Sequence, residues 1–151
     1  MKIAQLLIFM FVFFIAGSAV GIFLFQDHDS ASKSQNALVE TKVNQNFSLK
    51  INQSAKIKSE NVTITLLNVS EDSRCPQGGT CIGPGQVKVK LKFSKNGKIR
   101  KFTLISPASV KKLNQKKLGK YQIKLRSVKP YPQVDKTYKL EEYEVNMIII
   151  N

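Results

Sequence analysis

The chemistry available to this chain is limited by its side chains, because its 151 residues include only two cysteines and one histidine. The single histidine, His28, excludes sites built from several histidines and most catalysis in which histidine acts as an acid or base. Two cysteines cannot form a four-cysteine zinc site, and they permit at most one internal disulfide. No nucleophile-elbow, zinc-protease, phosphate-loop or dinucleotide motif is present. We therefore expect a protein that is not an enzyme and has no cofactor or metal.

The two cysteines lie in the segment SEDSRCPQGGTCIGPG, whose glycines and prolines predict a long, turn-rich loop. Pro76 and the adjacent Gly78 and Gly79 let the short stretch between the cysteines curl back, so a disulfide between Cys75 and Cys81 is geometrically reasonable. Closing so small a loop contributes only about 2 kcal/mol. We expect the disulfide mainly to fix the shape of the loop.

Three polar residues, Asp72, Ser73 and Arg74, stand immediately before the first cysteine. They allow two interpretations. In the first, the carboxylate and the guanidinium form a recognition site on a braced loop. In the second, Asp72 accepts loop N–H bonds as an Asx turn, and Arg74 pairs with Asp72 or with a backbone carbonyl. The second interpretation is purely structural and needs no ligand.

Two stretches of the chain resemble a family of bacterial and archaeal secreted or membrane-anchored domains without an assigned activity. The shared patterns are D-S-R-C-P followed by a second cysteine and a glycine turn, and Y-x-I-x-L-x-x-V-x-P-Y-P followed by an acidic residue and tyrosine. In this chain they occupy residues 72–76, 81, 85, 121–132 and 142–143. Family members usually carry an aromatic residue, most often Trp, where this chain has Gly83. The resemblance covers roughly 46–150 and implies an exported β-domain, but no activity.

The N-terminus contains an apolar run of 23 residues, 3–25, which follows only Lys2 and the α-amino group. A helix rises about 1.5 Å per residue, so a run of this length can cross a hydrocarbon core of roughly 30 Å. A cleavable signal peptide would end sooner at small residues, and residues 17–19 resemble such a site, although the apolar run continues beyond them. We expect residues 1–25 to be a transmembrane anchor, with a signal peptide as the alternative.

The charges around this run predict its orientation, since Lys2 precedes it and Asp27 and Asp29 follow it. The rest of the chain should face outward, in a single-pass protein of the cell membrane or in a secreted one if the run is cleaved. Disulfides persist in that compartment. Four N-x-[ST] sequences also occur, where chance would give about one. They indicate N-glycosylation or simply the Asn, Ser and Thr content of β-rich segments, and their acceptors are Asn46, Asn52, Asn61 and Asn68.

Residues 26–45 are polar and lack a sustained period, which is typical of a stalk. From residue 46 onward, short apolar alternations separated by turn residues predict strands. The expected strands are 46–51, 54–58, 61–69, 86–94, 98–105, 120–129 and 143–150. Regularly spaced short strands predict an all-β fold, a small antiparallel β-sandwich of immunoglobulin-like architecture over residues 46–151.

Two local signals add detail to this fold. Asn96 and Gly97 both tolerate positive φ, so they predict a tight hairpin between the strands that flank them. One short helix is expected over 106–118, because a serine can cap it, a proline begins it and Gly119 follows its end.

Charge is distributed very unevenly along the chain, which carries 24 Lys and Arg against 10 Asp and Glu and has a formal net charge of +14. Between residues 73 and 134 there are 16 Lys and Arg and no acidic residue. Strand alternation places several of them on one face of 86–94 or 120–129: Lys88, Lys90, Lys92, Lys124 and Arg126. If these faces belong to one sheet, they form a continuous positive surface. Exposed lysines can also simply block strand aggregation, but an ordinary soluble surface mixes both signs of charge.

These observations predict a non-catalytic, membrane-anchored extracytoplasmic domain that binds an anionic partner through its lysine-rich face. The candidates are an anionic lipid, an acidic envelope polymer and an acidic protein. Nucleic acid is disfavoured, because no nucleic-acid motif is present and aromatic residues do not interleave with the basic ones. Two alternatives remain: an accessory structural subunit of a membrane or envelope complex, and a thiol–disulfide redox protein. The redox alternative lacks a C-x-x-C spacing.

Overall fold

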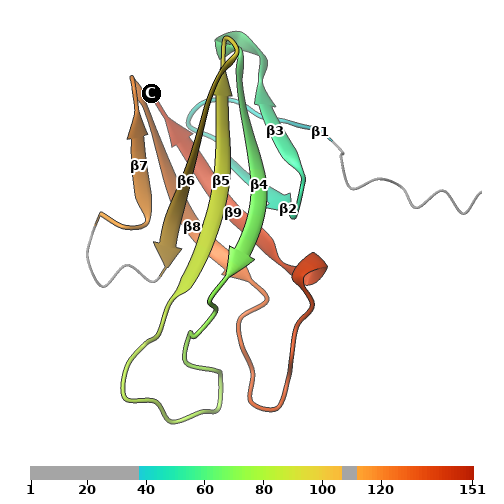
Figure 1. Cartoon of the computed structure of the whole chain (residues 1–151), viewed down its shortest axis with the longest axis vertical. Coiled ribbons are helices and arrows are strands. Elements are labelled where there is room, and N and C mark those ends of the chain that lie inside the picture. Colours follow the sequence, from blue (N-terminus) through green and yellow to red (C-terminus); the bar gives the residue numbers. More distant parts are fainter. Residues whose placement is uncertain (1–37, 107–111) are drawn as a thin grey trace, which may run out of the picture. The chain divides into compact units, whose positions relative to one another are not determined.

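The computed structural model describes residues 38–106 and 112–151, which form two β-sheets (Figure 1). The five-stranded sheet has the order β1-β3-β4-β5-β6 and the four-stranded sheet the order β2-β9-β8-β7. The first sheet contains β1 (Leu38–Glu40), β3 (Ser54–Ile57), β4 (Val62–Ser70), β5 (Val87–Lys95) and β6 (Lys98–Ser106). The second contains β2 (Asn46–Lys50), β7 (Gln115–Leu118), β8 (Tyr121–Lys129) and β9 (Glu144–Ile150).

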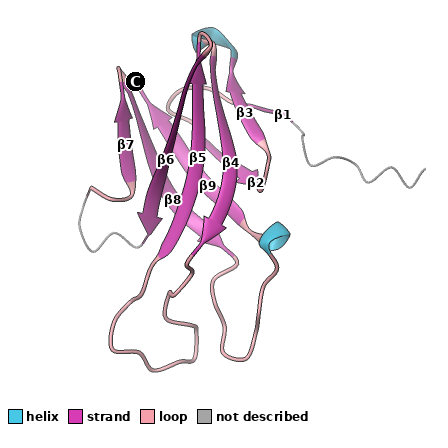
Figure 2. Ribbon diagram, in the orientation of Figure 1, coloured by secondary structure: helices cyan, strands magenta, loops and turns pink. Residues whose placement is uncertain are grey.

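Helical structure in the described residues is confined to two short 3-10 turns, η1 (Lys58–Glu60) and η2 (Leu140–Glu142) (Figure 2). Neighbouring strands pair antiparallel, except for the parallel pair of β1 and β3. The prediction of an all-β, two-sheet fold is confirmed. The immunoglobulin-like architecture stays a prediction.

The hydrophobic core lies between the sheets and draws fully buried residues from both, for example Leu49, Ile64, Leu91, Ile123 and Met147. The period of two explains this burial, because alternate side chains of a strand point to the same face. In β5, the apolar residues are buried and the three lysines between them are not. The apolar alternation in the sequence therefore determines which face of each strand packs inward.

The tight hairpin predicted between two strands is confirmed. Asn96 and Gly97 have φ values of 48° and 76° and connect β5 to β6 in antiparallel register. Positive φ at both central residues is the conformation that a type I′ turn requires. All seven expected strands are present, and each bound lies within one residue of the predicted one.

The helix predicted over 106–118 is wrong for the part of it that the structure describes. Ser106 ends β6, and residues 115–118 form β7, which pairs antiparallel with β8. Residues 107–111 of the predicted helix lie outside the described residues. Strand pairing buries Leu118 against the core, whereas the helical pattern offered few apolar residues to bury. Tertiary packing therefore outweighs the local helix signals here.

The N-terminal predictions fall partly on residues outside the described ranges. The anchor at 1–25 and the first part of the stalk lie there. The predicted end of the stalk, residues 38–45, instead belongs to the folded domain: β1 pairs with β3, and the Asn44 N–H donates to the Ile149 carbonyl at 2.7 Å. Within 38–106 and 112–151, no helix is long and apolar enough to span a membrane.

Candidate anion-binding site

A pocket of about 410 Å³ lies where the β5–β6 hairpin meets the turn between β7 and β8. Both turns lie toward the top of Figure 1. We call it the cationic pocket, because five basic side chains line it together with Phe93 and Tyr121: Lys95, Lys98, Arg100, Lys117 and Lys120. Four of these basic residues, Lys98, Arg100, Lys117 and Lys120, are exposed to solvent. The pocket therefore combines aromatic rings with solvent-exposed positive charges around them.

Two tight turns bring these residues together. Lys95 and Lys98 flank the Asn96–Gly97 turn, and Lys120 follows Gly119, whose φ is 64°. The rings of Phe93 and Tyr121 pack at 6.0 Å between centroids, so they join the ends of β5 and β8 across the core. The register of both hairpins fixes which lysines reach this end of the domain.

Tyr121 links the pocket to a neighbouring carboxylate, that of Glu60. Its hydroxyl donates to Glu60 of η1 and accepts a hydrogen bond of 2.7 Å from Lys95. Lys120 forms an ion pair with the same carboxylate at 3.0 Å. The hydrogen bonds from Tyr121 and Lys120 lower the pKa of Glu60, and the hydrogen bond to Glu60 raises the pKa of Lys120. Glu60 and Lys120 are therefore both charged at neutral pH.

Positive charge is left in excess at this site. Glu60 offsets one of the five cations that line the pocket. In the described part of the chain, no carboxylate lies within salt-bridge distance of Lys98, Arg100 or Lys117. Unpaired cations gathered around one cavity attract anions, and the surrounding low-dielectric wall strengthens their field.

The basic residues predicted from strand alternation do point outward, but they do not form one surface. Lys88, Lys90 and Lys92 lie on β5, in the five-stranded sheet, whereas Lys124 and Arg126 lie on β8, in the other sheet. The outward faces of two packed sheets point in opposite directions, so the condition for a continuous positive surface, that both strands belong to one sheet, is not met. Lys88 is also engaged in an ion pair with Glu71.

The anion-binding set predicted from the sequence contains none of the five basic residues of the cationic pocket. A signal for them exists, because all five belong to the acid-free stretch and stand close to Gly97 or Gly119. What the sequence does not reveal is that these two turns meet. The meeting depends on the packing of β5 against β8 and on β7, the strand that was predicted to be helical.

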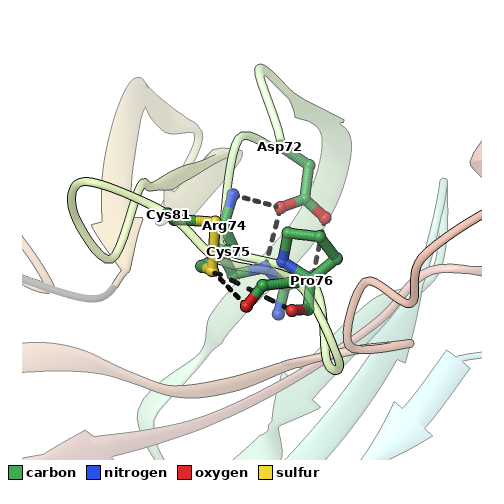
Figure 3. Close-up of a disulfide and its surroundings, with 6 residues drawn as sticks. Asp72, Arg74, Cys75, Pro76 and Cys81 are labelled. Atoms are coloured by element: carbon green, nitrogen blue, oxygen red, sulfur yellow. Dashed lines mark hydrogen bonds and ion pairs between the residues drawn. A yellow bond between two sulfur atoms is a disulfide. The ribbon is translucent and has the colours of Figure 1, made fainter.

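The disulfide predicted between Cys75 and Cys81 is present, with 5.9 Å between the two Cα atoms (Figure 3). Beside it, Arg74 is 6% exposed. Its Nε and Nη2 atoms donate hydrogen bonds of 2.7 and 2.6 Å to the carboxylate of Asp72. The other hydrogen bonds of its guanidinium go to the carbonyls of Val128 and Pro130, at 2.7 and 2.8 Å. Arg74 thus ties the loop to the end of β8.

Asp72 is held by a second partner, because the hydroxyl of Tyr143 donates to its carboxylate at 3.0 Å. Burial raises the pKa of Asp72, but the hydrogen bonds and charge of Arg74 outweigh it and bring the pKa below its usual value. Burial and the Asp72 charge raise the pKa of Tyr143 to about 12. The Asp72–Arg74 pair therefore remains charged inside the protein.

These contacts are the ones expected if Asp72, Ser73 and Arg74 serve to fold the loop, which is the second interpretation of the sequence. The guanidinium of Arg74 is buried and its bonds go to the protein itself, and the Ser73 hydroxyl exchanges hydrogen bonds with the backbone of Gln86 at 3.2 Å. Gly85 packs so closely that a Cβ there would lie 1.7 Å from the Ser73 carbonyl oxygen. A recognition role for Asp72, Ser73 and Arg74 stays a prediction.

Three of the four sequon asparagines are exposed, and the fourth, Asn68, is partly buried. Asn52 and Asn61 have φ values of 63° and 48°, a conformation that asparagine tolerates better than most residues. The side-chain oxygen of Asn68 is buried without a hydrogen-bond partner. Backbone conformation thus explains why asparagine occurs at two of these positions, and glycosylation stays a prediction.

No group of three or more His, Cys, Asp or Glu side chains among the described residues could hold a metal ion. Comparison of the chain with protein-family models, with curated proteins and with solved structures found no match. The functional argument therefore rests on the geometry of the domain, and the cationic pocket is the feature that carries it.

Proposed function

We propose that this chain is a non-catalytic binding module whose cationic pocket binds an anionic partner. The observation that carries the proposal is the set of five basic side chains that line one cavity, of which, among the described residues, only Lys120 forms an ion pair with a carboxylate, that of Glu60. A merely soluble surface would intersperse both signs of charge, and such interspersion would neutralise the cavity. An anion that enters the pocket meets Lys98, Arg100 and Lys117 without displacing an existing partner.

The pocket offers more than net charge. Lys95 is positioned by the Tyr121 hydroxyl and lies over the Tyr121 ring, 4.6 Å from its centroid, so at least one cation is ordered before a ligand arrives. Prior ordering reduces the entropy that binding must overcome. Exposed charges act over a screening length of about 8 Å at physiological ionic strength, so binding should weaken as salt is added.

In this proposal the apolar run at 3–25 holds the domain at the outer side of the cell membrane. The partner is then an anionic molecule of that compartment: a lipid headgroup, an acidic envelope polymer or an acidic protein. All three present carboxylate, phosphate or sulfate groups, which lysine and arginine recognise by charge-assisted hydrogen bonds.

The test compares two charge-matched double variants of the full-length chain. Lys98→Glu with Lys117→Glu alters the pocket, and Lys90→Glu with Lys92→Glu alters the outward face of β5 by the same net charge. Calorimetric titration with polyglutamate and with polyphosphate should show an affinity loss of roughly tenfold or more for the pocket variant, and a much smaller loss for the other. Equal losses would show that binding follows net charge alone and would overturn the proposal.

A further inference from the structure

Strand β6 is an edge strand of the five-stranded sheet and lies beside the cationic pocket. In the sheet order β6 stands last, and its pairing partner on the other side is β5. The N–H of Ile105 donates to the Leu113 carbonyl at 2.9 Å, so the backbone groups of Ile105 point away from β5. Backbone groups alternate in direction along a strand, so those of Ile99, Lys101 and Thr103 point the same way.

Those three residues present the free edge. Within 38–106 and 112–151, no backbone group pairs with the outward-pointing N–H and C=O groups of Ile99, Lys101 and Thr103. All three side chains are exposed, and Ile99 is 61% exposed. A row of unpaired groups of this length is a template on which a further strand can form.

Pockets lie on both faces of this edge. On the inward side, Lys98 and Arg100 of β6 line the cationic pocket. On the other side, a smaller pocket of about 240 Å³ is lined by both apolar and polar residues: Leu67, Leu91, Phe102, Lys90, Lys101 and Thr103. Because successive side chains of a strand point to opposite faces, a strand added to β6 would direct its side chains alternately toward the cationic pocket and toward this smaller, partly apolar pocket.

The positive charge of β6 indicates which kind of strand could pair with it. Lys98, Arg100 and Lys101 lie within four consecutive positions, and no carboxylate of the described residues forms an ion pair with them. Pairing of β6 with its copy in a second chain would bring two cationic strands together, which like-charge repulsion opposes. An acidic strand reverses the sign of that interaction.

We infer that β6 binds an acidic, extended polypeptide segment by strand addition, with carboxylates of the segment entering the cationic pocket. The inference rests on the proposed function, because the same cations attract the ligand. Main-chain hydrogen bonds from Ile99, Lys101 and Thr103 contribute to affinity, and the pocket selects acidic side chains. A phosphate polymer or a lipid headgroup would occupy the pocket without using the edge.

The first experiment uses Thr103→Pro, because the N–H of Thr103 points away from β5. Proline there removes an edge donor while it leaves the β5–β6 ladder and the net charge unchanged. The probe is a nonapeptide of alternating glutamate and valine, titrated into the full-length chain. We expect Thr103→Pro to weaken peptide binding by roughly tenfold and Thr103→Ala to leave it within about twofold, because alanine keeps the donor. Polyphosphate binding should not change in either variant.

The outcomes separate the two claims. Peptide binding to a folded Thr103→Pro chain at wild-type affinity would overturn strand addition, while loss of binding in the pocket variant would still support the proposed function. A wild-type chain that binds neither the peptide nor polyphosphate would overturn both claims.

A second measurement needs no variant, so it holds even if Thr103→Pro fails to fold. Amide hydrogen exchange of the wild-type chain is followed with and without saturating peptide. The amides of Ile99, Lys101 and Thr103 should exchange more slowly in the complex, because they become hydrogen-bonded. The amide of Phe102 points toward β5 and serves as the control. Unchanged exchange at the three edge amides would overturn the inference.

Discussion

The ammonium of Lys95 lies 2.7 Å from the hydroxyl of Tyr121, which in turn donates to the carboxylate of Glu60. Lys95 follows Phe93 by two positions in β5, so it occupies the inward face at the point where the apolar core ends. The same alternation that buries Phe93 therefore places a cation at the floor of the pocket. The hydrophobic core and the cationic pocket are therefore in direct contact at this end of the domain.

Tyr121→Phe tests this junction. The substitution keeps the buried ring but removes the hydroxyl that joins Lys95 to Glu60, so the free energy of unfolding should fall by about 1 kcal/mol. Urea denaturation measures the change. Tyr138→Phe is the matched control, because the Tyr138 hydroxyl makes a single exposed bond of 3.4 Å, and it should be neutral. Equal stability of all three proteins would show that the Tyr121 hydroxyl plays no part in stability.

Arg74→Met should be among the more damaging substitutions in the loop region. It leaves the Asp72 carboxylate without its cation and the carbonyls of Val128 and Pro130 without their donors. Removing one partner of a buried ion pair costs about 3 kcal/mol or more. Breaking the more exposed Lys88–Glu71 pair by Lys88→Ala should cost less than about 1 kcal/mol. Similar unfolding free energies for both variants would contradict the role assigned to Arg74.

The lowered pKa of Asp72 predicts how the stability of the folded protein changes at acidic pH. Its pKa in the folded protein is below the usual 3.8, so the unfolded chain binds the proton more readily. The stability that Asp72 contributes is complete above the unfolded value and is lost as pH falls through the folded pKa. Urea denaturation at a series of pH values should show this loss in the wild-type chain and a smaller one in Asp72→Asn. An identical pH dependence in both chains would be the contrary result.

Tyr143 gives the complementary prediction at alkaline pH. Its pKa of about 12 exceeds the usual 10.0, so its contribution is complete below the unfolded value and is lost as pH rises through the folded one. Ultraviolet titration should detect a late-ionising tyrosine in the wild-type chain. Tyr143→Phe should lack it, and Tyr131→Phe, which removes a more exposed ring, should retain it. Its persistence in Tyr143→Phe would show that another tyrosine is responsible.

Cys75→Ser with Cys81→Ser separates a structural disulfide from a redox one. A cross-link across so short a loop contributes about 2 kcal/mol, so the variant should be less stable but folded. Its polyglutamate affinity should equal that of the wild-type chain, because the loop precedes the first residue of β5 and the cationic pocket lies at the other end of that strand. Loss of ligand binding in a folded variant would instead connect the disulfide to function.

The sequence predicts the sheets better than it predicts the site, for a physical reason. In segments such as Val87–Lys95, the alternation of apolar and basic residues directly predicts which side chains are buried. The pair Asn96 and Gly97 likewise predicts a turn, because both residues tolerate positive φ. The pocket depends on two turns that are distant in sequence, and one of them follows β7, where strand pairing overrode local helix signals. The short β1 was missed because its three residues, Leu38–Glu40, are too few to show a period of two. Charge depletion indicated an anionic partner but could not show where the cations converge.

The most direct test of the central claim is lysine acetylation footprinting of the full-length chain with and without polyglutamate. Mass spectrometry reads each lysine separately, so the bound surface is located without a substitution. The cationic pocket predicts strong protection of Lys98, Lys117 and Lys120, with little change at Lys90 and Lys92. Protection concentrated at Lys90 and Lys92, or spread evenly over all exposed lysines, would contradict the assignment of the pocket as the binding site.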